Sequence, residues 1–340
     1  MSAPCPLLPP ALKIGDTIGF FSASAPATVS ANHRFNRAQD YLIAKGFNLQ
    51  AGMLTGKSDF YRSGSILAPA EELNRLIRDP NVNCIMSTIG GYNSNSLLPY
   101  IDYSALQANP KIIIGYSDST ALLLGIYART GLITFYGPAL IPSFGEFPPL
   151  VDETYNNLAA ILIEQPPLPY SYPLPSYWSD ERINWNDQQP IRPKTLYNNN
   201  CQFIGSNSVS GRVIGGNLNT LSGIWGSVYM PEIMAGDILF IEDSLKDIAT
   251  VERSFAMLAL NGIFDRVAAV ILGKHEGFDD AGSGRTPYDV LKEVLGTKTL
   301  PIVNGFDCCH THPMLTLPLG CQIMIDFGRQ QVSLIAPYLK

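Results

Sequence analysis

One short segment of the sequence has the pattern of a catalytic nucleophile. Residues 112–114 form a β-branched run that predicts a buried strand, and the apolar residues 121–127 predict a helix. Ser117 lies in the tight turn between them, where its side chain would emerge at the carboxyl edge of a sheet beside the free N–H groups of the helix. Gly115 precedes it by two residues, as in a nucleophile elbow, although Ser119 replaces the second glycine of that motif. A serine that only caps the helix is the structural alternative.

A nucleophilic serine needs a general base, and the base needs an acid to orient it. The chain has four histidines, of which His310 lies in a loop ahead of an apolar segment. Glu242 ends the apolar stretch 236–242, which predicts a strand. A carboxylate at that place is costly to bury unless it is paired, and a solvated turn is the alternative. Ser117, Glu242 and His310 would fit a triad assembled from distant loops, since a triad is defined by geometry and not by chain order.

Segments spread over nearly the whole chain resemble, in the expected order, those of the LD-carboxypeptidase family of serine peptidases. The matching segments are residues 15–22, 87–91, 115–118, 215–221, 239–244 and 310–318. The resemblance implies a hydrolase in which Ser117 is the nucleophile, His310 the general base and Glu242 the orienting acid. It also implies a homodimer. Cys309 departs from the glycine that many members have before the histidine.

A glycine pair follows the strand expected over residues 84–88. A turn without Cβ atoms lets a substrate approach main-chain N–H groups closely. Acyl-transfer chemistry needs such donors at the developing oxyanion. We therefore assign an oxyanion hole to the backbone N–H groups of Gly91 and Asp118, with Gly90 as a further candidate. A simple tight turn is the alternative.

Within the family, the resemblance is to the branch that confers self-immunity against peptidyl-nucleotide antibiotics of the microcin C type. It implies hydrolysis of the amide bond between an acyl group and the phosphoramidate nitrogen of a nucleotide. Trp185 matches the position that stacks on adenine, and Asn219 lies in a turn where it could hydrogen-bond to the substrate. Trp178 is a further candidate for substrate binding, with pinning of its segment onto the second domain as the alternative.

Two other functions stay open. A cytoplasmic murein LD-carboxypeptidase would trim tetrapeptides, and its D-amino-acid leaving group would need no aromatic platform. A non-catalytic nucleotide- or peptide-binding protein would keep the fold alone, but the presence of all three triad residues argues against this function.

Composition limits the classes of partner. The 340 residues carry a net charge of −6 and only 15% of them are charged, which argues against a nucleic-acid partner. No apolar run approaches the roughly 18 residues of a membrane helix, and the start of the chain lacks the pattern of a signal peptide. The six cysteines, including the adjacent Cys308 and Cys309, are spaced unlike a disulfide or zinc framework. These features predict a cytoplasmic protein with reduced thiols that acts on a small molecule and not at a membrane.

Two further patterns could indicate a metal or cofactor site, but neither is specific for one. His310 and His312 could suit a metal by spacing, but no third clustered ligand or zinc motif accompanies them. The turn 215–219 lacks the glycine and lysine pattern of a dinucleotide or phosphate loop. We therefore expect no metal and no cofactor, and a structural role for His312 in its loop.

The chain divides into two halves joined by an unusual segment. Over residues 1–165, apolar strands alternate with helices, which predicts an α/β domain with a parallel sheet that carries the nucleophile elbow. Residues 166–200 hold seven prolines and many aromatics, which predicts an irregular linker that folds over a site. Residues 201–340 predict a smaller, β-rich α/β domain that carries the glutamate and histidine of the triad, so the site would lie between the domains. The expected strands are 17–22, 84–88, 112–114, 132–136, 209–214, 236–242, 268–272 and 322–327, and the expected helices are 34–45, 70–78, 121–127 and 251–260.

Overall fold

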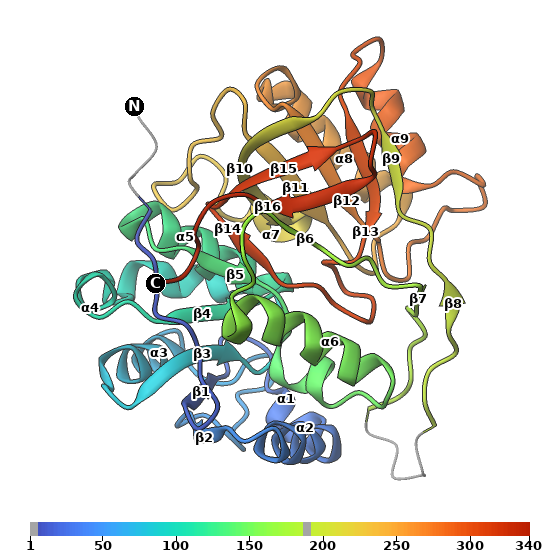
Figure 1. Cartoon of the computed structure of the whole chain (residues 1–340). Coiled ribbons are helices and arrows are strands. Elements are labelled where there is room, and N and C mark those ends of the chain that lie inside the picture. Colours follow the sequence, from blue (N-terminus) through green and yellow to red (C-terminus); the bar gives the residue numbers. More distant parts are fainter. Residues whose placement is uncertain (1–5, 186–191) are drawn as a thin grey trace.

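The apolar runs of the first half form the parallel core of one sheet. Ile112, Ile113 and Ile114 are each at most 2% exposed, as expected for a strand that is covered on both faces. In the computed structural model, which describes residues 6–185 and 192–340, this sheet has the strand order β14-β5-β4-β3-β1-β2 (Figure 1). The strands are β1 (Thr17–Phe21), β2 (Asn48–Ala51), β3 (Val82–Ser87), β4 (Ile112–Gly115), β5 (Thr134–Tyr136) and β14 (Leu317–Leu319). All pair in parallel except β14, which is antiparallel to β5.

The second half builds a larger, mixed sheet. Its order is β6-β16-β15-β10-β11-β12-β13-β9, and the central strands β10 to β13 are parallel. The bounds are β6 (Tyr170–Ser171), β9 (Gln202–Ile204), β10 (Val209–Asn217), β11 (Ile238–Glu242), β12 (Ala269–Gly273), β13 (Ile302–Phe306), β15 (Gln322–Asp326) and β16 (Gln331–Leu334). A separate pair, β7 (Tyr177–Trp178) and β8 (Tyr197–Asn198), lies in the segment that joins the halves.

Helices cover these sheets and also connect them. Their bounds are α1 (Ala27–Ser30), α2 (Asn32–Ala44), α3 (Leu67–Arg78), α4 (Tyr103–Ala108), α5 (Thr120–Thr130), α6 (Leu150–Ala159), α7 (Leu218–Ser222), α8 (Ile248–Leu260) and α9 (Pro287–Leu295). Helix α5 is buried along most of its length because it packs on β5 in its own half and on β10 and α7 in the other. It ends at Gly131, whose φ of +75° is the left-handed conformation typical of a helix C-terminus.

Two edge strands come from outside the half whose sheet they complete. The late strand β14 completes the edge of the first sheet, and β6, from the proline-rich segment, completes the edge of the second. Pro318 is tolerated in β14 because an edge strand leaves one side free of ladder hydrogen bonds. Because β14 belongs by sequence to the second half, its pairing with β5 ties the two halves together.

Every strand and helix that the sequence predicts is present, with ends that differ by a few residues, and the two-part α/β fold is confirmed. The sequence patterns do not predict strands β2, β9, β13, β14 and β16, nor the short strands β6, β7 and β8 in the segment expected to be irregular. The short strand β2 is only partly buried and lacks a strong apolar run, and β14 contains proline, so neither shows the usual strand pattern.

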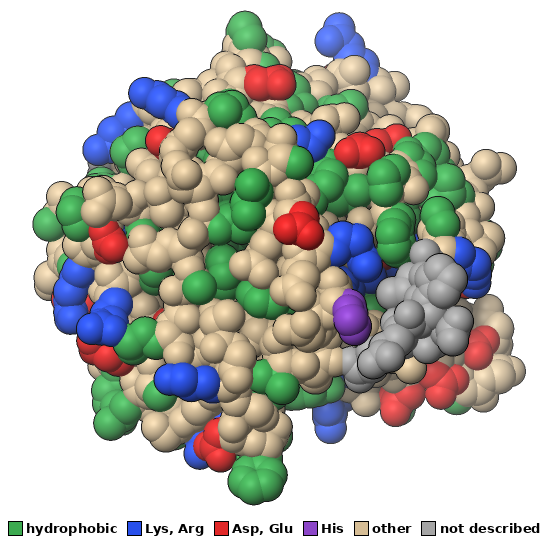
Figure 2. Space-filling view, turned by 90° about the horizontal axis from the view of Figure 1, so that it is seen from below, with side chains coloured by type: hydrophobic (Ala, Val, Ile, Leu, Met, Phe, Trp, Pro, Cys, Tyr) green, Lys and Arg blue, Asp and Glu red, His purple; other side chains and the backbone are tan. Residues whose placement is uncertain are grey.

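The surface carries mixed charge. Figure 2 shows Lys and Arg side chains interspersed with Asp and Glu side chains over the face that it presents. Within the described residues, no helix combines the length and the apolar character that crossing a bilayer requires.

Candidate active site

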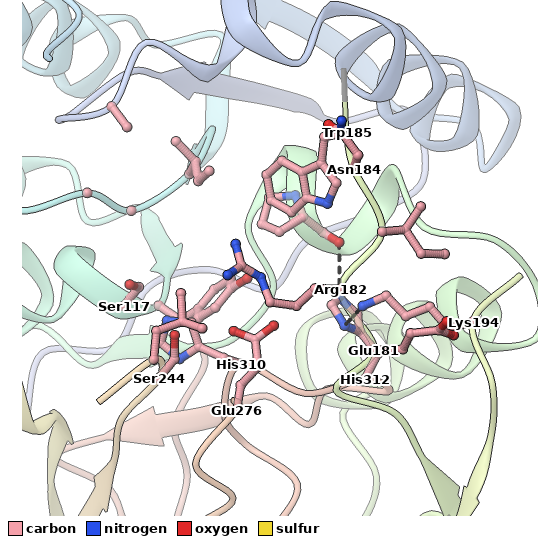
Figure 3. A pocket seen from close by; sticks show the side chains of 18 of the residues that line it. Ser117, Glu181, Arg182, Asn184, Trp185, Lys194, Ser244, Glu276, His310 and His312 are labelled. Atoms are coloured by element: carbon pink, nitrogen blue, oxygen red, sulfur yellow. Dashed lines mark hydrogen bonds between the residues drawn. The ribbon is translucent and has the colours of Figure 1, made fainter. Parts of the chain in front are cut away.

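The carboxyl ends of both sets of parallel strands border one cavity of about 440 Å³. This is where ligands bind in open α/β sheets, because loops that follow the strands converge there. The cavity lining includes five residues that the sequence predicts for the site: Gly90, Gly91, Ser117, Trp185 and His310. Figure 3 shows Ser117 and His310 on one side of this cavity and Trp185 on another.

Ser117 occupies a strained turn directly after β4. Its φ is +61°, in the left-handed region that residues other than glycine rarely adopt and that is often found at functional sites. Its N–H donates to the hydroxyl of Tyr136 at 3.0 Å, and its carbonyl accepts from Oγ1 of Thr120 at 2.6 Å. These bonds hold the turn so that the serine side chain borders the cavity, as a nucleophile elbow requires.

Glu242, the last residue of β11, is fully buried and fully hydrogen-bonded. Its Oε2 lies 2.6 Å from Nδ1 of His310, and its Oε1 accepts from the Tyr136 hydroxyl at 2.5 Å and from the Asn217 amide at 3.0 Å. Burial alone would raise the pKa of Glu242, but His310 and the hydrogen bonds outweigh burial and lower it. The carboxylate therefore stays ionised beside the histidine.

His310 is oriented from two directions. Nδ1 is engaged by Glu242, and the ring packs edge-on against Tyr116 with centroids 4.9 Å apart. Burial would lower the pKa of His310, but the Glu242 carboxylate outweighs it and raises the pKa above its ordinary value. With Nδ1 occupied, Nε2 is the nitrogen left to exchange a proton with a group in the cavity.

The backbone at Gly90 approaches the Ser117 turn too closely for any side chain. A Cβ on Gly90 would lie 2.7 Å from Cβ of Ser117 and 3.1 Å from the backbone nitrogen of Asp118. Gly91 has a φ of +151°, and a Cβ there would meet Oγ of Ser24 at 2.3 Å. Both glycines are therefore required by space, and Gly90 brings the main chain beside Ser117.

Asp118 turns its side chain away from the cavity. Its carboxylate is buried and accepts the backbone N–H groups of Asn93 at 3.1 Å and Ser94 at 2.9 Å. This ties the loop that follows Gly91 to the turn of Ser117. The side chain thus has a structural role, while the backbone nitrogen of Asp118 lies near Gly90.

Two predicted binding residues are not part of the described cavity lining. The backbone N–H of Asn219, in α7, donates to Oδ2 of Asp243 at 3.1 Å, which places it beside the acidic end of β11. Trp178, in β7, packs against Tyr197 with ring centroids 5.9 Å apart and lies under Nζ of Lys274 at 5.4 Å. Its position favours the alternative that this tryptophan pins the linker.

His310 and His312 both line the cavity, but their rings have different partners. Nε2 of His312 lies 3.0 Å from the carbonyl of Pro142, and its Nδ1 lies 3.3 Å from Nζ of Lys194 (Figure 3). Burial lowers the pKa of His312 to about 3, so the ring is neutral. Among the described residues, no three His, Cys, Asp or Glu side chains are grouped as a metal site would require. The five described cysteines are all free thiols.

Sequence reasoning missed several polar residues of the site, among them Tyr136, Asn217 and Glu276. Tyr136 and Asn217 are the last residues of β5 and β10, and Glu276 follows β12 and lines the cavity. Figure 3 shows the Glu276 carboxylate on the side of the cavity that holds His310. The available signal was their place at the carboxyl ends of predicted strands, the same signal that singled out Glu242.

Comparison with known proteins gives the family. The LD-carboxypeptidase N-terminal domain matches residues 18–137, and the LD-carboxypeptidase C-terminal domain matches residues 210–325. The microcin C7 self-immunity protein MccF of Escherichia coli is 65% identical over 334 residues, which are 98% of this chain and 97% of that protein. The murein tetrapeptide carboxypeptidase of Pseudomonas aeruginosa is 27% identical over 310 residues, 90% of this chain and 92% of the relative.

Solved structures agree with these matches. MccF in its wild-type apo state superposes with a TM-score of 0.97 at 65% identity, covering 98% of this chain and all of that one. An MccF-like protein from Bacillus anthracis superposes with a TM-score of 0.85 at 30% identity, covering 97% of this chain. Both domain models are matched in order, and the chain therefore belongs to the LD-carboxypeptidase family of serine peptidases, Peptidase S66.

Proposed function

We propose that this protein is a serine amidase that hydrolyses the acyl–nitrogen bond of aminoacyl- or peptidyl-nucleotides of the microcin C type and so detoxifies them. The observation that carries the proposal is that one cavity combines a strained serine, a histidine paired with a buried glutamate, and an indole from the linker. The first three groups suit acyl transfer, and the indole suits a nucleobase.

In the proposed reaction, His310 takes the proton of the Ser117 hydroxyl as the serine oxygen attacks the acyl carbon. Glu242 keeps the ring in the correct tautomer and stabilises the imidazolium that forms. When the tetrahedral intermediate collapses, the carbon–nitrogen bond breaks and His310 gives its proton to the leaving nitrogen. Water then hydrolyses the acyl-enzyme by the same proton transfers in the next half-reaction. The products are the free acid and the nucleotide with an amino group on phosphorus.

The developing oxyanion would be bound by the backbone N–H groups of Gly91 and Asp118, with Gly90 beside them. The close approach of Gly90 to Ser117 and to the nitrogen of Asp118 supports this assignment. Loss of one such donor typically lowers the rate by about 10²–10³, so we expect a similar loss from any substitution whose side chain displaces this backbone.

Relatives supply the support for the substrate class. MccF has been solved with aspartyl sulfamoyl adenosine and with glutamyl sulfamoyl guanosine, and a tryptophan-to-phenylalanine variant of it has been solved with adenosine monophosphate. An active-site mutant of MccF replaces a serine, an asparagine and a lysine by alanine. With a constant offset of one residue, these positions correspond to Trp185, Ser117, Asn219 and Lys246 here. We therefore place Trp185 under the base and Asn219 near the acyl group.

Location and assembly belong to the same proposal. Five free thiols are consistent with a reducing compartment, and we propose that the protein acts in the cytoplasm. We also propose that it is a homodimer, as the family resemblance implies. Within each protomer, the halves 1–165 and 201–340 would both contribute to one site, and the segment 166–200 would join them and supply the substrate loop. Sedimentation that gives a monomer at every concentration would overturn the dimer without affecting the reaction.

The deciding experiment is mass spectrometry of the products after incubation with aspartyl sulfamoyl adenosine and, separately, with a murein tetrapeptide. The proposal expects aspartate and sulfamoyl adenosine from the first compound, and no product from the matched Ser117→Ala variant. Release of D-alanine from the tetrapeptide, with the nucleotide conjugate intact, would assign the murein activity instead. No product from either compound would contradict both enzymatic functions.

A further inference from the structure

At one wall of the cavity lies a buried cluster of charged and polar side chains that the reaction does not use, and two of its members, Lys194 and His312, line the cavity. Its members are Arg34 from α2, Glu146, Lys194 from the linker, and His312 from the histidine loop. Their exposures are 2%, 2%, 8% and 4%. Four segments far apart in the sequence therefore place ionisable groups together in the interior, where unpaired charges would be costly.

Arg34 is the fixed centre of this cluster. Its Nη2 donates to Oε2 of Glu146 and to the carbonyl of Pro142, both at 2.7 Å, and its Nε donates to the carbonyl of Ile141 at 3.0 Å. These partners lie around the edge of the guanidinium, so they set its plane and leave its faces for packing. Burial alone would raise the pKa of Glu146, but the groups around it, Arg34 first among them, together outweigh burial and lower that pKa to about 2.

One face of that guanidinium packs against Trp185. Cζ of Arg34 lies 4.8 Å from the centroid of the indole, within the range of a cation–π contact. Trp185 is only half-buried and contributes to the cavity lining. The indole is thus supported by a cation that is itself immobilised by Glu146 and two carbonyl groups.

The same cluster holds the linker on both sides of Trp185. After it, Nζ of Lys194 lies 3.3 Å from both Oε2 of Glu146 and Nδ1 of His312. Before it, Ser179 and His312 exchange two backbone hydrogen bonds, of 2.8 and 3.0 Å. His312 therefore contacts the linker on both sides of the indole, through Ser179 before it and Lys194 after it.

We propose that Arg34 is a positioning residue for nucleobase recognition: held by Glu146, it fixes the plane of the Trp185 indole at the cavity. The inference rests on the proposed function, because it assigns a role to Arg34 through the residue that we place under the base. A planar guanidinium can lie flat against an indole, and a lysine ammonium at the same site cannot, so charge alone is insufficient. Buried ion pairs are seldom needed for stability, since apolar residues of similar volume often serve equally well. Orientation of the Trp185 indole would explain why charged side chains are buried at this place.

The test compares Arg34→Lys with Arg37→Lys. Arg37 is one turn away on the same helix and also bonds to the 140–147 segment, donating to the carbonyl of Gly145 at 2.8 Å, but it packs on Phe147. The probes are adenosine monophosphate and ribose 5-phosphate, which lacks the base, with dissociation constants measured by calorimetry on the full chain. We expect Arg34→Lys to weaken adenosine monophosphate about 2- to 30-fold, the range of a cation–π contact. Ribose 5-phosphate binding, and the Arg37→Lys variant with both probes, should stay within about twofold of wild type.

A double-mutant cycle shows whether Arg34 acts through the indole. In a Trp185→Ala background, Arg34→Lys should cause no further loss of adenosine monophosphate affinity, because the residue through which it acts is gone. Full additivity of the two losses, equal weakening of both probes, or an unchanged affinity in Arg34→Lys would each overturn the inference.

Glu146→Gln provides a second test in case Arg34→Lys does not fold, which a thermal melt would reveal. Glu146→Gln keeps the shape of the side chain but removes the charge that holds Arg34 and Lys194. It should weaken the binding of adenosine monophosphate and leave the binding of ribose 5-phosphate unchanged, and an unchanged preference for the base would contradict the inference.

A failure of the proposed function and a failure of the role of Arg34 give different results. If wild type does not cleave aspartyl sulfamoyl adenosine, the proposed function fails. If it does, and Arg34→Lys binds like wild type, only the role of Arg34 fails.

Discussion

The phenolic hydroxyl of Tyr136 donates a 2.5 Å hydrogen bond to Oε1 of Glu242, and the oxygen of that hydroxyl accepts the backbone N–H of Ser117 at 3.0 Å. One fully buried tyrosine therefore joins the serine turn to the carboxylate that holds His310. The link crosses the boundary between the two halves, since Tyr136 ends β5 and Glu242 ends β11. It couples the position of the proposed nucleophile to that of the proposed acid.

Tyr136→Phe should lower kcat by roughly 10- to 100-fold, because it removes one hydrogen bond to a charged group and leaves a buried N–H without its partner. KM should change little. The lost donor also leaves more negative charge on Glu242, which raises the pKa of His310 further and moves the acid limb of the pH profile upward.

Tyr127→Phe is the matched control for that substitution. Tyr127 is equally buried, but its hydroxyl accepts from Arg212 at 3.2 Å and does not touch the proposed triad. Steady-state kinetics on both variants checks the prediction, and a Tyr136→Phe enzyme with the kinetics of Tyr127→Phe would contradict it.

Ser117→Ala and His310→Ala should each cut turnover by roughly 10³- to 10⁶-fold. Residues that act as one unit give losses that do not add, so the double variant should be no slower than the worse single variant. Circular dichroism melts should show the fold retained. Near-normal turnover of Ser117→Ala would exclude the serine mechanism.

Activity should fall as the pH is lowered, and the fall should begin above the ordinary pKa of a histidine, about 6.5. Burial opposes the charged ring of His310, but Glu242 outweighs it and raises the pKa, so the ring becomes protonated at a higher pH and can no longer accept the serine proton. Glu276→Gln, which removes another carboxylate that raises this pKa, should shift the acid limb to lower pH. A profile of kcat/KM between about pH 5 and pH 9 tests both signs, and a flat acid side would refute the assignment of His310 as base.

Chelators should leave the rate unchanged. Both ring nitrogens of His312 have partners, the Pro142 carbonyl and the Lys194 ammonium, so this ring is not poised to bind a metal together with His310. Turnover measured before and after treatment with EDTA checks this. Activity that is lost with EDTA and restored by zinc would revive the metal interpretation of the two histidines.

Trp185→Ala should weaken nucleotide conjugates by roughly 5- to 150-fold, the range given by about 1–3 kcal/mol of base stacking. Acyl conjugates that lack a base should be affected much less. Inhibition constants for aspartyl sulfamoyl adenosine and for an analogue that ends in 1-deoxyribose make the comparison. Equal losses on both would mean that Trp185 only holds its loop, and no loss on either would favour the murein activity.

The sequence by itself determined the elements and the chemical groups. Ser117, Glu242 and Gly90 each follow or end an apolar run, and such runs become buried strands wherever they lie in the fold. Parallel strands place their carboxyl ends at one edge of a sheet, so residues at those ends are drawn together before any packing detail is known. That is why the elbow, the strand-end carboxylate and the two-part α/β fold could be predicted from local patterns and family resemblance.

Only the tertiary structure decided which polar groups meet. The hydrogen bond from Asn217 to Glu242 joins paired residues of the neighbouring strands β10 and β11. The bond from Tyr136 to Glu242 joins the two sheets, and no local pattern encodes how the sheets meet. The pairing of β14 with β5 and the packing of Arg34 on Trp185 join segments more than a hundred residues apart in the sequence. Trp178 packs on Tyr197 within the linker, where no periodic pattern indicates its neighbours. Local periodicity reports only whether a residue is buried. Its partner across the core is chosen by the packing of the whole chain.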